Sequence, residues 1–403
     1  MLNTKLKQLA LRVPPLRRLW ESHRSVLREN EQLRKGLTAK DFNHLLHYAR
    51  SARLRRLPIR PDTMLSAGCA GLWYFEWIES RLGHLREHIG VEYYTPKPEG
   101  LPANVRWIEN TVGDMSDVHD ASCDVVFSGQ NIEHIWPYEA VDFLMEAWRV
   151  LKPGGFLIMD SPNRLITRQL NWSHPEHTIE LTPDEAATLC ELAGFDLRKT
   201  YGVWLCDPPG GTIPTLPLVP DENETEWTVP ERIICAEDCP SGSFVWWLEA
   251  TKSERKPDRG ALAEHMRQVF EQSWPERAAR FKSLVGTRHY DNGRLVVSAT
   301  ANESGFLLYG PYLPLPCGDY EVVFEAVAIG GQGTLIFDVV AAGEVIASAE
   351  RSVADLSRSK EVRLSFSLSE MRFGLEFRAQ SRGGAAFKVW APIIDIPPDV
   401  LPK

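Results

Sequence analysis

The sequence contains no uninterrupted apolar stretch near the ~18 residues that a membrane span needs. Its basic N-terminus lacks a continuous apolar segment ahead of a small-residue cleavage site, so we expect no secretion signal. Its seven cysteines are scattered and odd in number, which favours reduced thiols over a disulfide framework. Together these absences predict a cytoplasmic protein.

The cysteines also offer no complete metal site. Cys235 and Cys239 have a spacing that could begin a zinc site, but no second pair follows at a matching distance. We therefore predict no metal ligands among the cysteines.

Charge is unevenly distributed along the chain. Residues 1–60 carry 15 Lys and Arg against 4 Asp and Glu, a net +11, while the whole 403-residue chain carries −9 and residues 61–403 therefore −20. A basic segment before an acidic body favours an anionic partner such as a membrane surface or a polyphosphate. A solvated or partner-packed helix would explain the segment equally well. Nucleic acid is not expected, because the acidic body would repel it.

The basic segment reads as two helices. In residues 16–37 apolar side chains recur every seven residues, and His23 and Asn30 interrupt the second seam position, which is the pattern of a short coiled coil. We expect this helix either to join copies of the chain into a homo-oligomer or to pack on the body. A second helix is predicted from Ala39 to Arg56, ending before Pro58.

Residues 58–253 alternate between predicted strands and helices, which indicates an α/β fold with a doubly wound sheet. The stretch from Thr63 to Glu92 reads as a strand, a small-residue turn at Gly68, a helix and a second strand. Such a unit presents a nucleotide to a helix N-terminus. Glu92 follows Gly68 by 24 residues, a spacing that suits hydrogen bonds to ribose hydroxyls.

Later motifs make this reading more specific. The strand 123–128 is followed by Asn-Ile-Glu-His-Ile at 131–135 and by Trp-Arg-Val-Leu-Lys-Pro-Gly-Gly-Phe at 148–156. With Glu92 and Asp114, these motifs resemble the class I S-adenosylmethionine-dependent methyltransferases, over roughly residues 60–205. The resemblance implies a Rossmann-like methyltransferase sheet, S-adenosylmethionine as the cofactor, and transfer of its sulfonium methyl group to a nucleophile.

The resemblance also implies which residues hold the cofactor, at or near the ends of the first four strands. They are Ser66, Gly68, Cys69 and Gly71 at the methionine part, Glu92 at the ribose, Asp114 and Met115 at the adenine, and Gln130 at the methyl-donor end. The chain departs from the family where Ser66 replaces an acidic residue and Ala70 replaces glycine. This departure leaves the contacts to the cofactor's amino group without a candidate and leaves an inactive enzyme open.

The reaction asks mainly for alignment, because the sulfonium is already an activated donor. A hydroxyl acceptor also benefits from a nearby base, and the candidates are His134, after the fourth strand, and His174 and His177, after the fifth. His134 is either a base or a side chain beside the cofactor. His174 and His177 could act as base and orienting partner, bind a divalent metal as in some sugar methyltransferases by resemblance, or bond to backbone. We predict no metal ligands here.

Residues 207–243 are rich in Pro, Gly and acidic residues, which indicates an inserted loop or lid beside the acceptor site. A helix within residues 254–284 then bridges to residues 285–403, where seven or eight short alternating stretches predict an antiparallel β-sandwich. Before the α/β domain lie the N-terminal helices, residues 1–57. The segment 310–320 resembles, less specifically, jelly-roll carbohydrate-binding sandwiches. Tyr309, Tyr312 and Trp390 either stack on a sugar ring or belong to the core.

These features favour an S-adenosylmethionine-dependent O-methyltransferase acting on a saccharide of a bacterial surface polysaccharide, such as O-antigen or capsule. The N-terminal helices would hold it to itself, or peripherally to an assembly complex or anionic lipid at the inner membrane. The alternatives are a catalytically impaired glycan-binding or scaffold protein, and a methyltransferase acting on a small molecule or a protein amine.

Overall fold

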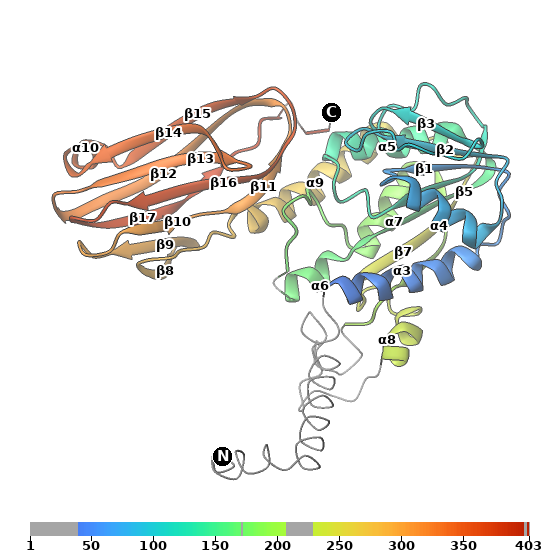
Figure 1. The fold of residues 1–403 in the computed structure, drawn as a ribbon, viewed down its shortest axis with the longest axis horizontal. Helices are drawn as coiled ribbons and strands as arrows, with labels where there is room; N and C mark the ends of the chain where they lie inside the picture. Colours follow the sequence, from blue (N-terminus) through green and yellow to red (C-terminus); the bar gives the residue numbers. More distant parts are fainter. Residues whose placement is uncertain (1–38, 171, 207–228, 399–400, 403) are drawn as a thin grey trace, which may run out of the picture.

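The computed structural model describes residues 39–170, 172–206, 229–398 and 401–402 (Figure 1). The predicted coiled coil at residues 16–37 lies outside the described residues, as does most of the predicted lid. Of that lid, the structure describes helix α8, Val229–Ala236. No helix among the described residues is long and apolar enough to cross a membrane.

The α/β part of the molecule is built on one seven-stranded sheet, in the order β3-β2-β1-β4-β5-β7-β6. The strands β3, β2, β1, β4 and β5 pair in parallel, while β7 runs antiparallel to both β5 and β6. The carboxyl ends of the five parallel strands therefore lie along one edge, and the chain order reverses between β1 and β4. The strands are β1 Thr63–Ala67, β2 Glu87–Glu92, β3 Val105–Glu109, β4 Cys123–Gly129, β5 Leu151–Pro162, β6 Phe195–Gly202 and β7 Val245–Lys252.

Helices cover both faces of this sheet, which is why β1 is buried along its whole length (Figure 1). One face packs against α3 (Ala39–Arg55), α4 (Leu72–Leu82) and α6 (Arg164–Gln169). The other packs against α5 (Pro137–Val150), α7 (Pro183–Leu192) and α9 (Arg259–Ala278). The doubly wound Rossmann-like fold predicted from the sequence is thus confirmed.

Helix α9 connects the sheet to the second half of the molecule. Its Leu262, Met266, Val269 and Phe270 lie on one face and are buried. The hydrophobic core continues from the sheet face through α9 into the C-terminal strands without a break.

The C-terminal part is a β-sandwich of two five-stranded antiparallel sheets (Figure 1). One sheet has the order β10-β16-β13-β14, with β11 also pairing to β16, and the other has the order β15-β12-β17-β9-β8. A short helix, α10 (Val353–Arg358), follows β14. The strands are β8 Thr287–Asp291, β9 Arg294–Ala299, β10 Gly305–Leu308, β11 Pro311–Leu315, β12 Gly318–Gly331, β13 Thr334–Ala341, β14 Glu344–Ser352, β15 Glu361–Leu368, β16 Arg372–Ser381 and β17 Ala385–Ile394.

Candidate active site

The turns after the carboxyl ends of β1, β2, β3 and β4 lie along one edge of the sheet, where the strand order reverses. A crevice is expected at such an edge, and this is the predicted cofactor site. Gly68, Gly71 and Gln130 are half-buried at this edge, and Asp114 is exposed. Gly68 has φ +72°, and a Cβ atom there would overlap the side chain of Asn131, so the turn requires glycine. Gly71 begins α4 without a side-chain cap, which leaves the first backbone N–H groups of that helix for a ligand.

Ser66, one of the predicted cofactor residues, is fully buried and contacts His88. Its hydroxyl lies 2.8 Å from Nε2 of His88, and the His88 ring packs edge-on against Phe75 of α4 at 4.7 Å. On the other side of the ring, Nδ1 of His88 lies 3.7 Å from Glu79. Burial lowers the pKa of His88 below its ordinary value. The Ser66 hydroxyl therefore faces the helix layer and is not available to a ligand in the crevice.

Cys69 and Met115 are also fully buried. The Cys69 thiol lies 3.9 Å from the carbonyl oxygen of Val91, and burial raises its pKa. Met115 packs in the core, and its backbone N–H donates to Glu146 at 2.9 Å. Neither side chain presents a surface to the crevice.

Glu92 ends β2 and organises the loop that follows. Its Oε1 accepts hydrogen bonds from the backbone N–H groups of Tyr94, at 2.8 Å, and Thr95, at 2.9 Å. Burial raises the pKa of this carboxyl. The position suits a carboxylate that contacts a ribose, and the loop itself depends on it.

Asp114 lies in the loop after β3 and is exposed. Its Oδ1 accepts the backbone N–H of Ser116 at 3.0 Å, and hydrogen bonds from Ser116 hold its pKa below the ordinary value. The carboxylate is therefore charged at neutral pH at the outer end of the crevice.

Gln130 connects the crevice to an ion pair that the sequence did not reveal. Gln130 has φ +55°, and its side-chain amide donates to Oδ1 of Asp160 at 2.9 Å. Oδ2 of Asp160 accepts Nε of Arg50, from α3, at 2.5 Å, and both charged side chains are buried. Helix α3 is thus tied directly to the floor of the site.

The three predicted catalytic histidines lie together beside the end of β4. The ring centroids of His134 and His177 are 4.8 Å apart, and those of His174 and His177 are 4.7 Å apart. The backbone N–H of Thr178 donates to the carbonyl of Glu133 at 2.6 Å, which fixes the loop after α6 against the end of β4. The fold therefore brings together residues more than 40 positions apart.

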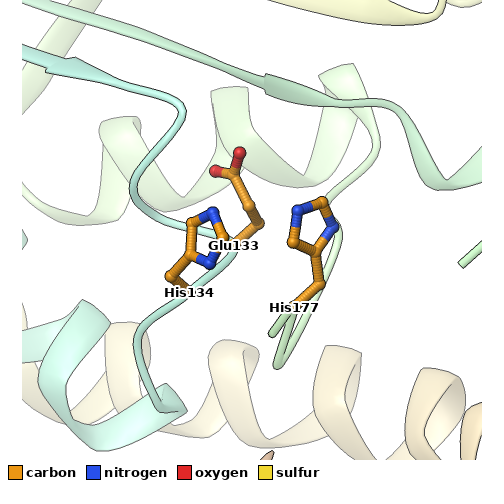
Figure 2. Close-up of side chains that lie close together, drawn as sticks. All are labelled: Glu133, His134 and His177. Atoms are coloured by element: carbon orange, nitrogen blue, oxygen red, sulfur yellow. The ribbon is translucent and has the colours of Figure 1, made fainter. Parts of the chain in front are cut away.

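Two carboxylates complete this cluster. Glu180 accepts a hydrogen bond at 2.7 Å from Nδ1 of His177, and its other oxygen accepts the hydroxyl of Thr167. Glu133 is fully buried between His134 and His177 (Figure 2). Glu133 stood within a motif in the sequence, but nothing there marked it or Glu180 as functional.

The cluster has unusual protonation energetics. Burial raises the pKa of Glu133 to about 8. Burial, with His177 and His174 nearby, lowers the pKa of His134 to about 3. Burial also lowers the pKa of His174. Groups with such shifts concentrate at functional sites.

Comparison with known proteins agrees with this architecture. Residues 65–159 match the model of the methyltransferase domain family. A probable S-adenosylmethionine-dependent methyltransferase of Mycolicibacterium smegmatis is 35% identical over 126 residues, which are 30% of this chain and 47% of that protein. A probable S-adenosylmethionine-dependent methyltransferase of Mycobacterium tuberculosis H37Rv is 32% identical over 122 residues, 30% of this chain and 39% of its own. The chain thus covers less than half of either relative.

Among solved structures, an S-adenosylmethionine-dependent methyltransferase of Archaeoglobus fulgidus is 18% identical, with a TM-score of 0.37, over 51% of this chain and 94% of its own. The strand order shows a Rossmann-like methyltransferase sheet over residues 63–252, and the family match lies within it, at residues 65–159. The chain is thus similar to S-adenosylmethionine-dependent methyltransferases, and this similarity implies S-adenosylmethionine as the cofactor.

Proposed function

We propose that the protein transfers the methyl group of S-adenosylmethionine to a hydroxyl group of a saccharide, as a step in making a bacterial surface polysaccharide. The observation that carries the choice of an oxygen acceptor is the cluster of His134, His174 and His177 beside the crevice. An alcohol must lose its proton as it is methylated, whereas a neutral amine attacks with its lone pair and can lose its proton afterwards.

In the proposed arrangement Gly68 and Gly71 admit the methionine part of the cofactor, Glu92 contacts the ribose and Asp114 the adenine. The acceptor oxygen attacks the methyl carbon in line with the sulfur. The C–O bond forms as the S–C bond breaks, and the electron pair of that bond returns to sulfur to give S-adenosylhomocysteine. The hydroxyl proton passes to the histidine cluster, where Glu180 holds His177 in a fixed orientation.

A small cleft next to the cluster supports a polar acceptor group. It has a volume of about 40 Å³, which admits one small group of an acceptor rather than a whole sugar ring, and lies between the loop after α6 and helix α9. Trp172 offers an apolar ring at this cleft, and Arg277 and Arg280 offer donors to hydroxyl or acidic groups of a sugar.

The β-sandwich, which follows the C-terminal end of α9, also supports the proposal of a saccharide acceptor. Tyr309, Tyr312 and Trp390, the sequence's candidates for stacking on a sugar, are each half-buried. Tyr309 pairs through its backbone with Lys282, close behind the end of α9. The net +11 of residues 1–60 supports a place for the protein at an anionic membrane surface, beside the assembly of such polymers.

The test is methyl transfer from radiolabelled S-adenosylmethionine to surface polysaccharide isolated from a strain that lacks the gene. We expect alkali-stable label in the glycan with the full chain, and at least ~10-fold less with His177→Ala. Mass spectrometry of the glycan should locate the methyl group on a sugar oxygen. Label that appears only on amines of other acceptors would overturn the choice of a hydroxyl.

A second function is favoured by one observation, the engagement of Ser66 with His88 where the family carries an acid. In that case the protein binds a glycan and transfers no methyl group. Binding of polysaccharide by the full chain, with no binding of S-adenosylmethionine, would identify this function.

A further inference from the structure

Glu133 is a buried carboxylate with no hydrogen bond of ordinary geometry to either oxygen among the described residues. The hydroxyl of Ser161 lies near enough to favour its charged form, but burial outweighs this effect. A buried carboxylate without a partner costs several kcal/mol, so such a group usually faces a cation or a ligand. The side chains next to it are the imidazoles of His134 and His177 (Figure 2).

These three side chains present two nitrogen donors and one oxygen donor to one point. One ligand atom from each lies within 4.8 Å of the other two. Tetrahedral zinc, with bonds of about 2.1 Å, separates its ligand atoms by roughly 3.4 Å, so the side chains need to close by at most about 1.4 Å. His134 is half-buried, which gives an ion a way in from solvent.

The surroundings of His177 fit a metal ligand. Its Nδ1 is bonded to Glu180, which leaves Nε2 to face Glu133 and His134 (Figure 2). The hydroxyl of Thr167 in turn holds the second oxygen of Glu180. A carboxylate on the far nitrogen is the usual partner of a metal-bound histidine, because it fixes the ring and raises its basicity.

The neighbouring histidine is not part of the donor set. The His174 ring lies 6.0 Å from that of His134, and its Nδ1 accepts the backbone N–H of Glu176 at 3.3 Å. His174 thus stays beside the three donors without joining them.

We propose that Glu133, His134 and His177 bind a divalent transition-metal ion, with Zn²⁺ as the best match to two imidazoles and one carboxylate. Three protein ligands leave a fourth position open. There the ion would bind the acceptor hydroxyl and lower its pKa, so that an alkoxide reaches the methyl group and the proton leaves to His174 or to water. This last step rests on the proposed function, whereas metal binding does not.

The test is titration of the chelator-treated full chain with Zn²⁺ alone, in a calorimeter, and with Co²⁺ as a spectroscopic substitute. We expect one ion per chain and visible Co²⁺ absorption typical of tetrahedral coordination. His177→Ala and the conservative Glu133→Gln should lose the absorption and weaken binding at least ~10-fold, and Glu180→Gln should weaken it about 10-fold. His119→Ala, which changes an exposed histidine, is the matched control and should bind like the parent.

Parent protein that binds Zn²⁺ no more tightly than the Glu133→Gln variant, with circular dichroism showing both folded, would overturn the proposal. Titration of the same samples with S-adenosylmethionine separates the two proposals. Cofactor binding and methyl transfer without a metal would reject the metal site alone, and a bound metal without methyl transfer would reject the proposed function alone.

Discussion

Ser66 stands where the resemblance calls for an acid, and its hydroxyl is bonded to the buried ring of His88. The position therefore belongs to a polar network between β1, β2 and α4 rather than to the crevice. His88 reaches Glu79, and Glu79 accepts the amide of Asn104 at 2.8 Å. In this chain the network, and not the cofactor, explains the residue at this position.

Ser66→Ala tests that role. The change removes the bond to Nε2 of His88 and leaves a fully buried imidazole nitrogen without a partner, which should cost about 1–3 kcal/mol of unfolding free energy. Affinity for S-adenosylmethionine should stay within about twofold of the parent. Denaturant unfolding and calorimetry give the two numbers, and Ser365→Ala, at an exposed position of β15 far from the cofactor edge, is the control. A large loss of affinity for S-adenosylmethionine with an unchanged free energy of unfolding would show instead that Ser66 contacts the cofactor.

Glu139, at the start of α5, gives a dependence of stability on pH. It is 6% exposed, and burial together with Asp142 raises its pKa to about 7, from 4.5. The folded state therefore holds the proton more tightly than the unfolded state, and this contribution, up to about 3 kcal/mol, is present below pH ~4.5 and lost as the pH rises through ~7. In Glu139→Gln the loss should be absent. The free energy of unfolding, measured at about pH 5 and pH 8, should rise in the variant relative to the parent as the pH rises. The same difference between variant and parent at both pH values would contradict this role of Glu139.

For single residues, the sequence predicts only those features of the site that depend on neighbours in the chain. Gly68 at positive φ and Glu92 at the end of β2 follow from the strand–turn–helix–strand pattern. The burial of Met115 does not, because the same spacing serves a core and a ligand site equally well. Nor does the placement of Glu133 beside His177, or the bond from His177 to Glu180, since both depend on a loop that docks from about 40 residues further along the chain.

Among the elements, α3 is bound to the site by one buried ion pair, Arg50 with Asp160, between residues 110 positions apart. Arg50 also lies over the ring of Trp77, at 4.9 Å from its centroid. Asp160 in turn accepts the amide of Gln130. The helix and the turn after β4 therefore depend on the same carboxylate.

Arg50→Ala should uncouple them. Removing the guanidinium leaves Asp160 as a buried charge, which should cost about 3–5 kcal/mol of stability, and it loosens the Gln130 turn. We expect weaker binding of S-adenosylmethionine and faster hydrogen exchange at residues 129–134. Arg55→Ala, on the exposed side of the same helix, should change neither. Unchanged exchange in the turn would show that α3 is only a cover for the sheet.

Helices and strands could be predicted where the sequence carries a local start signal or the apolar pattern of a buried element. Helix α7 begins with a local signal of this kind: Thr182 and Glu185 bond to each other's backbone, and Pro183 occupies the first turn. Strands β8, β11 and β14 were not among the stretches expected to form strands. Strands β8 and β14 lie at sheet edges with largely exposed residues, so their sequences lack the alternation of a half-buried strand.

For the whole molecule, the sandwich reaches the rim of the cofactor crevice. The hydroxyl of Tyr94 donates to the sulfur of Met371 at 3.2 Å, and its ring lies edge-on to Phe373 at 5.9 Å. Tyr94 belongs to the loop that Glu92 holds at the end of β2. The sandwich is thus placed to steady the loop over the proposed ribose position.

Phe373→Ala tests this coupling between the two halves. The loss of the ring contact should loosen the loop, seen as faster hydrogen exchange at residues 93–100, and should weaken S-adenosylmethionine binding by about 2–10-fold, since one aromatic pair contributes about 0.5–1.5 kcal/mol. Val345→Ala, in the exposed edge strand β14, is the control. Equal hydrogen exchange at residues 93–100 in both variants would mean that the sandwich contacts the loop without stabilising it.

The central claim is that S-adenosylmethionine lies across the carboxyl ends of β1 to β4 with its ribose on Glu92. Calorimetric titration of the full chain with S-adenosylmethionine, alongside Glu92→Ala and the neighbouring exposed Glu109→Ala, tests it most directly. We predict saturable binding of one molecule per chain, weakened at least ~10-fold by Glu92→Ala and unchanged by Glu109→Ala. No heat of binding up to several hundred micromolar, on the order of the weakest usual substrate affinities, or equal binding by all three proteins would contradict it.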